Sequence, residues 1–265
     1  GSGKLTIKSK ATAGEPYSYS TGIYAFNGKV VIKDNPVIDI CATGDTDDNG
    51  YVLNHMTCIY STDITIEGGH INMIASKSGH GMGYPQRIIW DTASYDVTIN
   101  GGTIYAEGGK SNYYNGGITN QCTRAVINGG NVNMNKLNGS EPDKLKHPVN
   151  SKDVELYCTI ITVGDADDNG KNTLSKNAKV EALTIKYNDN NYSYGTDGMC
   201  TDNKGKLYLW LPEGSVVSKV VTENATYTGE CTTNAECKIV NLQVKGNCFV
   251  EEALLNTNSE VTGNI

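Results

Sequence analysis

The chain has 265 residues, of which 30 are Gly and 16 are Tyr while only 2 are Phe and 2 are Trp, a β-rich and turn-rich composition. With 22 Lys and Arg against 29 Asp and Glu, the net charge of −7 argues against binding to nucleic acid or to an anionic membrane surface. The sequence has no run of 18 apolar residues, which argues against membrane insertion by a helix. Hydrophobic residues make up 38% of the chain, enough for one large or two ordinary cores.

A short apolar-x-apolar segment recurs along the first half of the chain, at steps of 25, 34, 33 and 28 residues. A Gly pair follows each of the last three copies at the same offset, and a second apolar-x-apolar segment follows the pair. The five copies are Leu5-Thr6-Ile7, Val30-Val31-Ile32, Ile64-Thr65-Ile66, Val97-Thr98-Ile99 and Ala125-Val126-Ile127, and the pairs are Gly68-Gly69, Gly101-Gly102 and Gly129-Gly130.

This repeat predicts an all-β fold in which residues 1–152 form a right-handed parallel β-helix of about five coils. A single coil cannot bury its own apolar side, whereas stacked coils align the repeated Ile positions in one interior ladder. Gly suits the bends because it accepts a positive φ and close backbone approach. The alternative is an antiparallel sandwich built from regularly spaced hairpins.

The composition changes after residues 136–153, which contain two prolines among alternating charges and are predicted to be a linker. From residue 154 onward, apolar residues alternate with polar ones in runs that end in turn-forming residues. Residues 153–265 are therefore predicted to form a small antiparallel β-sandwich. The runs are Leu156–Ile160, Val180–Ile185 and Leu207–Leu211.

The repeat resembles the β-helical regions of secreted surface proteins of gut-type Firmicutes, among them carbohydrate-binding domain-containing proteins. The resemblance covers roughly residues 1–135 and rests on segments such as Ile64–Gly69 and Val97–Gly102, and on the Gly-His-Gly-rich insertion Ser78–Gly83. Thr201–Gly214 is similar to the module that often follows these repeats. The resemblance implies this architecture and a secreted or cell-surface bacterial location.

Eight cysteines occur without a CxxC spacing, which favours disulfides in an oxidising compartment over a zinc site, with reduced buried cysteines as the alternative. Cys231 and Cys237 are the most plausible local pair. The remaining predicted pairs are Cys41–Cys58, Cys122–Cys158 and Cys200–Cys248.

A D-x-D-x-N-G motif occurs twice and corresponds to the first half of a calcium loop, in which oxygens at alternate positions converge on a hard cation. The Glu usual at loop position twelve is missing, and the alternative is an ordinary exposed turn. If structural calcium binds, the ligands are Asp45, Asp47 and Asn49 in the first loop and Asp165, Asp167 and Asn169 in the second.

No recognisable catalytic constellation surrounds the four histidines, so no catalytic residue is assigned. The enzyme alternative is a polysaccharide lyase or hydrolase, which the predicted fold suggests only by analogy. A lyase would need a basic residue such as Arg87, Arg124 or a Lys beside calcium-binding aspartates. An aligned stripe of acidic and basic side chains on one outer sheet would favour this alternative, whereas an even polar surface would favour a structural spacer.

Aromatic side chains favour the main interpretation, a secreted or cell-surface glycan-binding or adhesion module without catalysis, because rings stack on the apolar faces of sugars. Tyr208 and Trp210 alternate with three leucines, so both would be exposed if the leucines face the core, unless another element covers them. The carbohydrate-binding candidates are Tyr84, Trp90, Tyr113, Tyr114, Tyr208 and Trp210. Tyr105 also falls at an outward strand position, and the expected partner is a polysaccharide or other glycan.

Overall fold

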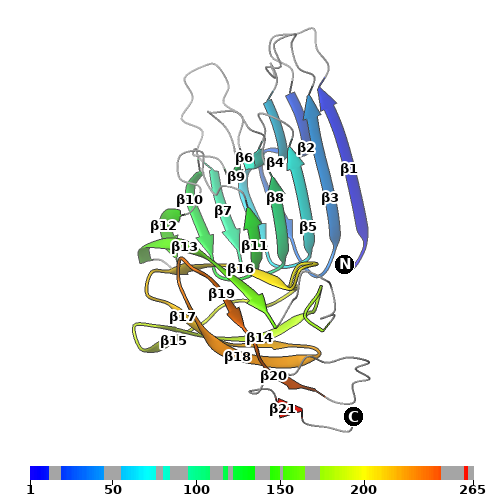
Figure 1. Cartoon of the computed structure of the whole chain (residues 1–265). Helices are drawn as coiled ribbons and strands as arrows, with labels where there is room; N and C mark the ends of the chain where they lie inside the picture. Colours follow the sequence, from blue (N-terminus) through cyan, green and yellow to red (C-terminus); the bar gives the residue numbers. More distant parts are fainter. Residues whose placement is uncertain are drawn as a thin grey trace, which may run out of the picture.

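The structure is a computed structural model, and it describes residues 1–11, 19–44, 55–75, 80–83, 95–107, 116–118, 122–134, 144–149, 152–164, 174–245 and 260–261. Every regular element in these ranges is a β-strand, so the all-β prediction is confirmed (Figure 1). A search of the same ranges for a helix of membrane-spanning length and apolarity returns none.

A five-stranded sheet with strand order β1-β3-β5-β8-β11 forms one wall of the N-terminal half (Figure 1). All of its pairings are parallel and without a register shift. Residues about one repeat apart therefore lie side by side, as Ile38, Ile71 and Ile104 do. The strands are β1 (Lys4–Ala11), β3 (Val37–Gly44), β5 (His70–Ala75), β8 (Thr103–Glu107) and β11 (Asn131–Met134).

A second parallel sheet has the order β10-β7-β4-β6-β9, with β2 also paired to β4. The antiparallel hairpin alternative for the repeat is therefore wrong. The long strands β2 and β4 pair over most of their length, with one register shift between Ala25 and Lys29. The strands are β2 (Tyr19–Ile32), β4 (His55–Ile66), β6 (His80–Gly83), β7 (Tyr95–Ile99), β9 (Gly116–Ile118) and β10 (Cys122–Ile127).

The repeated apolar positions fill the space between the two parallel sheets. Ile66, Ile99 and Ile127 are fully buried in one ladder, and Ile71 and Ile104 face them from the other sheet. These side chains have β-branched shapes that suit a pleated sheet, and their alternation with polar residues places one face inside. The repeat thus encodes one continuous core.

The C-terminal half consists of a four-stranded sheet (β12-β13-β16, with β19 beside β13) and a six-stranded sheet (β15-β14-β17-β18-β20-β21). Most pairings are antiparallel, while β13–β19 and β20–β21 are parallel. The strands are β12 (Lys144–Val149), β13 (Lys152–Val163), β14 (Val180–Tyr187), β15 (Asn190–Tyr192), β16 (Lys206–Pro212), β17 (Val216–Thr222), β18 (Ala225–Thr232), β19 (Glu236–Ile239), β20 (Asn241–Val244) and β21 (Glu260–Val261).

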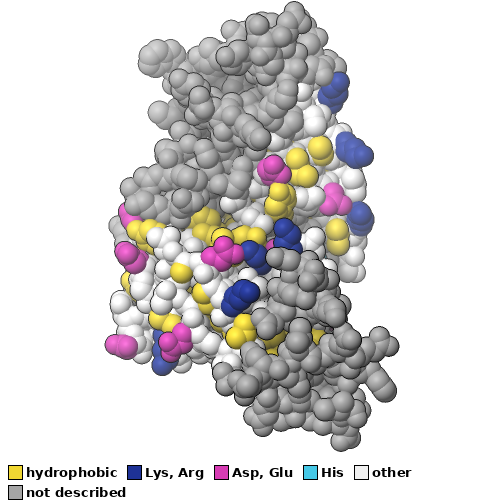
Figure 2. Space-filling view, viewed as in Figure 1, with side chains coloured by type: hydrophobic (Ala, Val, Ile, Leu, Met, Phe, Trp, Pro, Cys, Tyr) yellow, Lys and Arg dark blue, Asp and Glu magenta, His cyan; other side chains and the backbone are white. Residues whose placement is uncertain are grey.

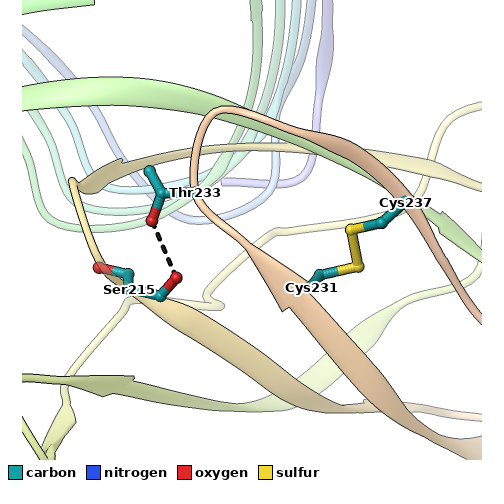
Figure 3. The surroundings of a disulfide bond; sticks show 4 residues. All are labelled: Ser215, Cys231, Thr233 and Cys237. Carbon is teal, nitrogen blue, oxygen red and sulfur yellow. Dashed lines mark hydrogen bonds between the residues drawn. A yellow bond between two sulfur atoms is a disulfide. The ribbon is translucent and has the colours of Figure 1, made fainter.

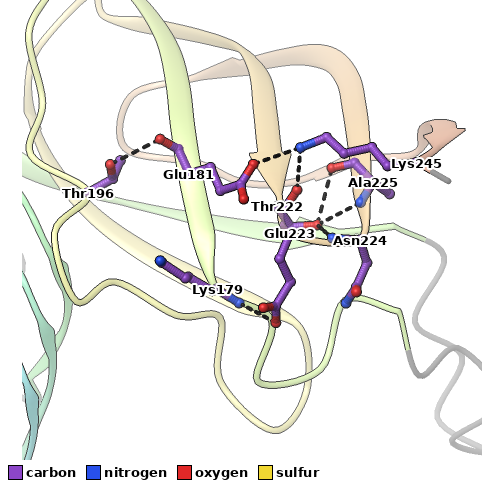
Figure 4. Close-up of polar contacts among 8 residues, drawn as sticks. All are labelled: Lys179, Glu181, Thr196, Thr222, Glu223, Asn224, Ala225 and Lys245. Carbon is purple, nitrogen blue, oxygen red and sulfur yellow. Dashed lines mark hydrogen bonds and ion pairs between the residues drawn. The ribbon is translucent and has the colours of Figure 1, made fainter. Parts of the chain in front are cut away.

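A second core lies between these two sheets and includes Leu207, Leu209, Val217 and Tyr227. At one edge, the Lys245 Nζ donates to Glu181 Oε2 at 2.8 Å and to the Thr222 carbonyl at 2.7 Å, which joins the ends of three strands (Figure 4). Residues 144–149, predicted to be part of a linker, instead form strand β12, because their backbone completes a hairpin with β13.

The C-terminal half covers the β11 end of the parallel stack. Trp210 lies in the first core although it belongs to β16, and its Nε1 donates to the Val132 carbonyl at 2.9 Å. The side chain of Asn131 donates to the Cys200 carbonyl at 2.7 Å and accepts from the Tyr208 backbone N–H at 2.7 Å. These bonds satisfy the backbone polar groups that the end of a stack would otherwise leave unpaired.

The Gly-Gly bends serve two purposes. The second Gly of each pair has a positive φ, between 90° and 97°, which the left-handed bend requires. The first Gly provides space for the segment 194–198 from the C-terminal half. A Cβ on Gly101 would lie 2.5 Å from the Asp197 carbonyl oxygen, and one on Gly129 would lie 2.4 Å from Gly195. The backbone N–H of the second Gly in two of these pairs donates a hydrogen bond to this segment. Gly102 N–H donates to the Asp197 carbonyl at 2.6 Å, and Gly130 N–H donates to the Gly195 carbonyl at 2.9 Å.

The predicted disulfide Cys231–Cys237 is confirmed (Figure 3). The predicted pair Cys41–Cys58 is wrong, because both are free thiols that point in different directions. Cys41 lies on the outer face of β3, whereas Cys58 is buried in the first core, where burial raises its pKa to about 12.

The two other predicted pairs involve parts of the chain that the structure does not describe. Cys200 is a free thiol, and its predicted partner Cys248 lies outside the described residues, so the pair Cys200–Cys248 stays a prediction. For the pair Cys122–Cys158, the side chain of Cys122 lies outside them as well.

Candidate functional site

The outer face of the five-stranded sheet presents an ordered row of polar side chains. Side chains alternate between the two faces of a strand, and the parallel register places equivalent outward positions next to one another. This row, the outer row, consists of Thr6, Asp39, Asn72, Tyr105 and Asn133. At a strand spacing of about 4.8 Å, it is about 19 Å long from the first strand to the fifth.

Tyr105 is the aromatic member of the outer row, and its side chain is 39% exposed. Its hydroxyl donates to Glu107 Oε2 at 2.8 Å, on the same face of β8. Partial burial raises the pKa of the Tyr105 hydroxyl, and the hydrogen bond and negative charge of Glu107 raise it further. The ring therefore stays neutral at physiological pH and is held by its hydroxyl end.

A second outward row lies beside the first and contains Lys8, Cys41, Ile74 and Glu107. Ile74 is 38% exposed, which leaves apolar surface next to the Tyr105 ring. Figure 2 shows hydrophobic and acidic side chains interspersed over this sheet, with Lys side chains along the β1 edge. The face therefore combines an aromatic ring, amide and carboxylate groups, and both signs of charge.

Such a face can make the two kinds of contact that a sugar requires. An aromatic ring with a fixed polar end offers an apolar surface beside hydrogen-bonding groups. Asn72 and Asn133 lie on the neighbouring strands on either side of Tyr105, and an amide can both donate to and accept from a hydroxyl.

The predicted two-ring platform of Tyr208 and Trp210 is wrong. Trp210 is only 1% exposed because β16 lies between the two cores: its leucines face the second core, and Trp210 faces the first. Tyr208 is half-buried, and burial raises the pKa of its hydroxyl. The period-two pattern correctly assigned the leucines to a core, but it carries no information about what covers the opposite face.

The other predicted carbohydrate-binding residues, Tyr84, Trp90, Tyr113 and Tyr114, lie outside the described residues. The same is true of all six predicted calcium ligands, Asp45, Asp47, Asn49, Asp165, Asp167 and Asn169. The two motifs do follow equivalent features, since each comes directly after a strand and a Gly, at Gly44 and at Gly164. Elsewhere, in the part of the chain with described coordinates, no group of three or more His, Cys, Asp or Glu side chains could hold a metal ion.

An aligned row of charges crosses the second parallel sheet. Lys29, Asp63, Asp96 and Arg124 occupy equivalent positions on neighbouring strands. Lys29 Nζ lies 3.2 Å from Asp63 Oδ2, and Arg124 Nε lies 3.6 Å from Asp96 Oδ2. The two carboxylates are thus adjacent, each with one basic partner. Arg124, considered above as a basic residue for a lyase, shares this row, whereas Arg87 lies outside the described residues.

Sequence reasoning did not select the outer row as a site. The signal was present in the repeat, because Asp39, Asn72 and Tyr105 are each 33 residues apart and each is flanked by apolar residues. No model of a known protein family matches the chain, and the searches of curated proteins and of solved structures return no match either.

Proposed function

We propose that this protein is a glycan-binding or adhesion module without catalysis, and that the outer row is its binding face. The observation that carries the proposal is the exposed Tyr105 ring between two amide side chains on neighbouring strands of one parallel sheet. The ring would stack on a sugar, while Asn72 and Asn133 would bond its hydroxyl groups. Glu107 holds the Tyr105 hydroxyl and thereby restricts the tilt of the ring.

We also propose that strands β1 to β11 form a right-handed parallel β-helix of about five coils and that the C-terminal half is a small β-sandwich. The uninterrupted parallel register of the five-stranded sheet, the aligned Ile ladder and the Gly-Gly bends support the first assignment. The shared core between two mainly antiparallel sheets supports the second. In this arrangement, the outer row crosses successive coils and suits an extended, linear glycan.

A secreted or cell-surface bacterial location is part of the proposal. The Cys231–Cys237 disulfide supports it, because disulfides persist in oxidising compartments. The resemblance to surface proteins of gut-type Firmicutes points to the same location. Calcium bound by the two Asp-rich loops would have a structural role, since each loop directly follows the end of a strand.

Binding to immobilised glycans, followed by affinity electrophoresis with the soluble polysaccharides that bind, tests the proposed function. Tyr105→Ala should weaken binding about tenfold, which corresponds to about 1.4 kcal/mol. Tyr105→Phe keeps the ring and should retain most of the affinity. Tyr24→Ala is the matched control, because Tyr24 is also an exposed strand tyrosine (62%) but lies on the second parallel sheet. Equal binding by the Tyr105→Ala and Tyr24→Ala variants would refute the assignment of the site.

The alternative that the protein cleaves a polysaccharide is favoured by the charge row, because two adjacent carboxylates beside basic residues are the arrangement that lyases and hydrolases need. Release of oligosaccharides from a polyuronate, abolished in an Asp63→Asn, Asp96→Asn variant that remains folded, would establish this activity. Retention of glycan without product would support the binding module. If the protein neither retains a glycan nor releases a product, the structural-spacer alternative is supported.

A further inference from the structure

The two ends of the parallel stack differ in how their apolar side chains are covered. One inner ladder runs through Leu5, Ile38, Ile71, Ile104 and Val132. Its last three members are at most 1% exposed and Ile38 is 6% exposed, whereas Leu5 in β1 is 46% exposed. The C-terminal half covers the β11 end. In the described ranges, no strand pairs with the outer edge of β1.

The second sheet is open at the same end. The inward residues Ile23 and Val30 of β2 are half-buried, whereas Ile59 and Ile64, the β4 residues they pair with, are fully buried. On the outer face of the same sheet, the Tyr24 ring is 62% exposed and stacks on Tyr60 with centroids 4.7 Å apart. Stacked repeats require a cover at each end, and contiguous exposed apolar surface marks an interaction site.

The chemistry of β1 specifies the partner. Lys4, Lys8 and Lys10 all lie on the outward face of this strand and are exposed, while Leu5 and Ile7 occupy the inward positions. Lys4 already pairs with an acidic residue of the adjacent strand, since its Nζ lies 3.4 Å from Asp39 Oδ2. We propose that the open end binds an extended segment of a partner protein in which apolar residues alternate with acidic ones. The segment adds a strand to β1, places its apolar residues over Leu5 and Ile7, and places its acidic residues beside the lysines.

The same charges disfavour a second copy of this chain as the occupant. In a symmetric dimer, two β1 strands would pair antiparallel, with Lys4 of one copy near Lys8 or Lys10 of the other when the outward faces match. Like charges directly opposite each other on paired strands are destabilising. A row of Lys on an edge strand is also a common protection against self-association. An acidic partner strand converts this repulsion into attraction.

Fluorescence anisotropy with a labelled synthetic peptide in which Glu alternates with Val and Ile tests the proposal. We expect saturable binding that weakens with added salt, and no saturable binding of the same peptide with Lys in place of Glu. Leu5→Asp should weaken binding at least about tenfold. Ala182→Asp, on an exposed position of β14, introduces the same charge away from the open end and should leave binding unchanged. Lys8→Glu lowers the charge of the three-lysine row from +3 to +1, so it should weaken binding of the Glu peptide and reduce its preference over the Lys peptide.

Three results would overturn the proposal. The first is the absence of saturable binding of the Glu peptide at millimolar protein concentration, and the second is equal binding of the Glu and Lys peptides. The third is a dimer in analytical ultracentrifugation that Leu5→Asp dissociates, which would make a second copy the occupant. If circular dichroism shows that Leu5→Asp is unfolded, the exposed surface substitution Lys8→Glu decides the test alone.

Discussion

The close approach of the C-terminal half to the Gly-Gly bends predicts a large and specific effect of one methyl group. In a Gly129→Ala variant, the new Cβ would lie 2.4 Å from the Gly195 Cα, 2.4 Å from the Gly195 carbonyl oxygen and 2.5 Å from the Asn100 carbonyl oxygen. All three are backbone atoms, so no side-chain rotation relieves the contact. The segment around Gly195 would have to move away by about 1 Å to reach an ordinary van der Waals distance.

That movement would break the hydrogen bonds that join the two halves at this bend. Gly130 N–H donates to the Gly195 carbonyl at 2.9 Å, and Gly195 N–H donates to the Asn128 carbonyl at 2.8 Å. The Tyr194 hydroxyl donates to the Gly130 carbonyl at 2.9 Å. At about 1 kcal/mol for each bond, the predicted loss in the free energy of unfolding is about 3 kcal/mol. For a chain of this size, the midpoint of thermal unfolding should fall by roughly 6–12 °C.

Gly28→Ala is the matched control. Both glycines have ordinary φ values, but the nearest atom to a Cβ on Gly28 lies at 3.4 Å, so this variant should change stability by less than about 0.5 kcal/mol. Differential scanning calorimetry of the three proteins measures the effect, and hydrogen exchange at the Gly195 amide locates it. Equal midpoints for Gly129→Ala and Gly28→Ala would refute the reasoning that the first Gly provides space for the C-terminal half.

Three further predictions concern burial, pH and calcium. Trp210→Phe should cost roughly 1–3 kcal/mol in urea unfolding, because it leaves the buried Val132 carbonyl without its 2.9 Å donor; an unchanged urea midpoint would contradict this. Burial raises the pKa of Tyr192 to about 12 in the folded protein. Above pH 10 the unfolded state therefore ionises first, and the free energy of unfolding falls as the pH rises from 10 to 12. Thermal melts across this range should show a shallower decline for Tyr192→Phe than for the parent protein. Millimolar calcium should raise the midpoint of thermal unfolding, because a ligand that binds only the folded state stabilises that state. Asp47→Ala or Asp167→Ala should reduce this rise. No shift at saturating calcium would exclude both loops as calcium sites.

The sequence was sufficient to predict the parallel pairing in the N-terminal half. Asn72 and Tyr105 lie 33 residues apart in equivalent positions of the repeat, and the structure places them side by side. The alternation of Tyr105 with the apolar residues on either side of it also predicted that its ring would point outward. Both inferences depend on local periodicity, which the chain carries in every unit.

Features that depend on contacts between distant segments were not predictable in this way. Cys41 and Cys58 are close in sequence. Side chains alternate between the two faces of β3, which places the Cys41 thiol on the outer face, whereas the Cys58 side chain lies in the first core. Trp210 has the spacing of an exposed residue, yet it is buried because a second core lies on that side of β16. A single-strand pattern identifies two faces and cannot specify which of them another layer covers.

The glycine pairs show where these two kinds of information meet. The positive φ of Gly102 and Gly130 follows from the bend itself, and one repeat is enough to predict it. The requirement for Gly101 and Gly129 has two sources: the carbonyl of the preceding repeat (Glu67 or Asn100), and residues 195–197, which lie far along the chain and follow no repeat. Because the same bends that shape the N-terminal half also hold the C-terminal half, the halves on either side of the predicted boundary between residues 152 and 153 are joined by direct backbone contacts. A change at either side of this contact must therefore alter the stability of both.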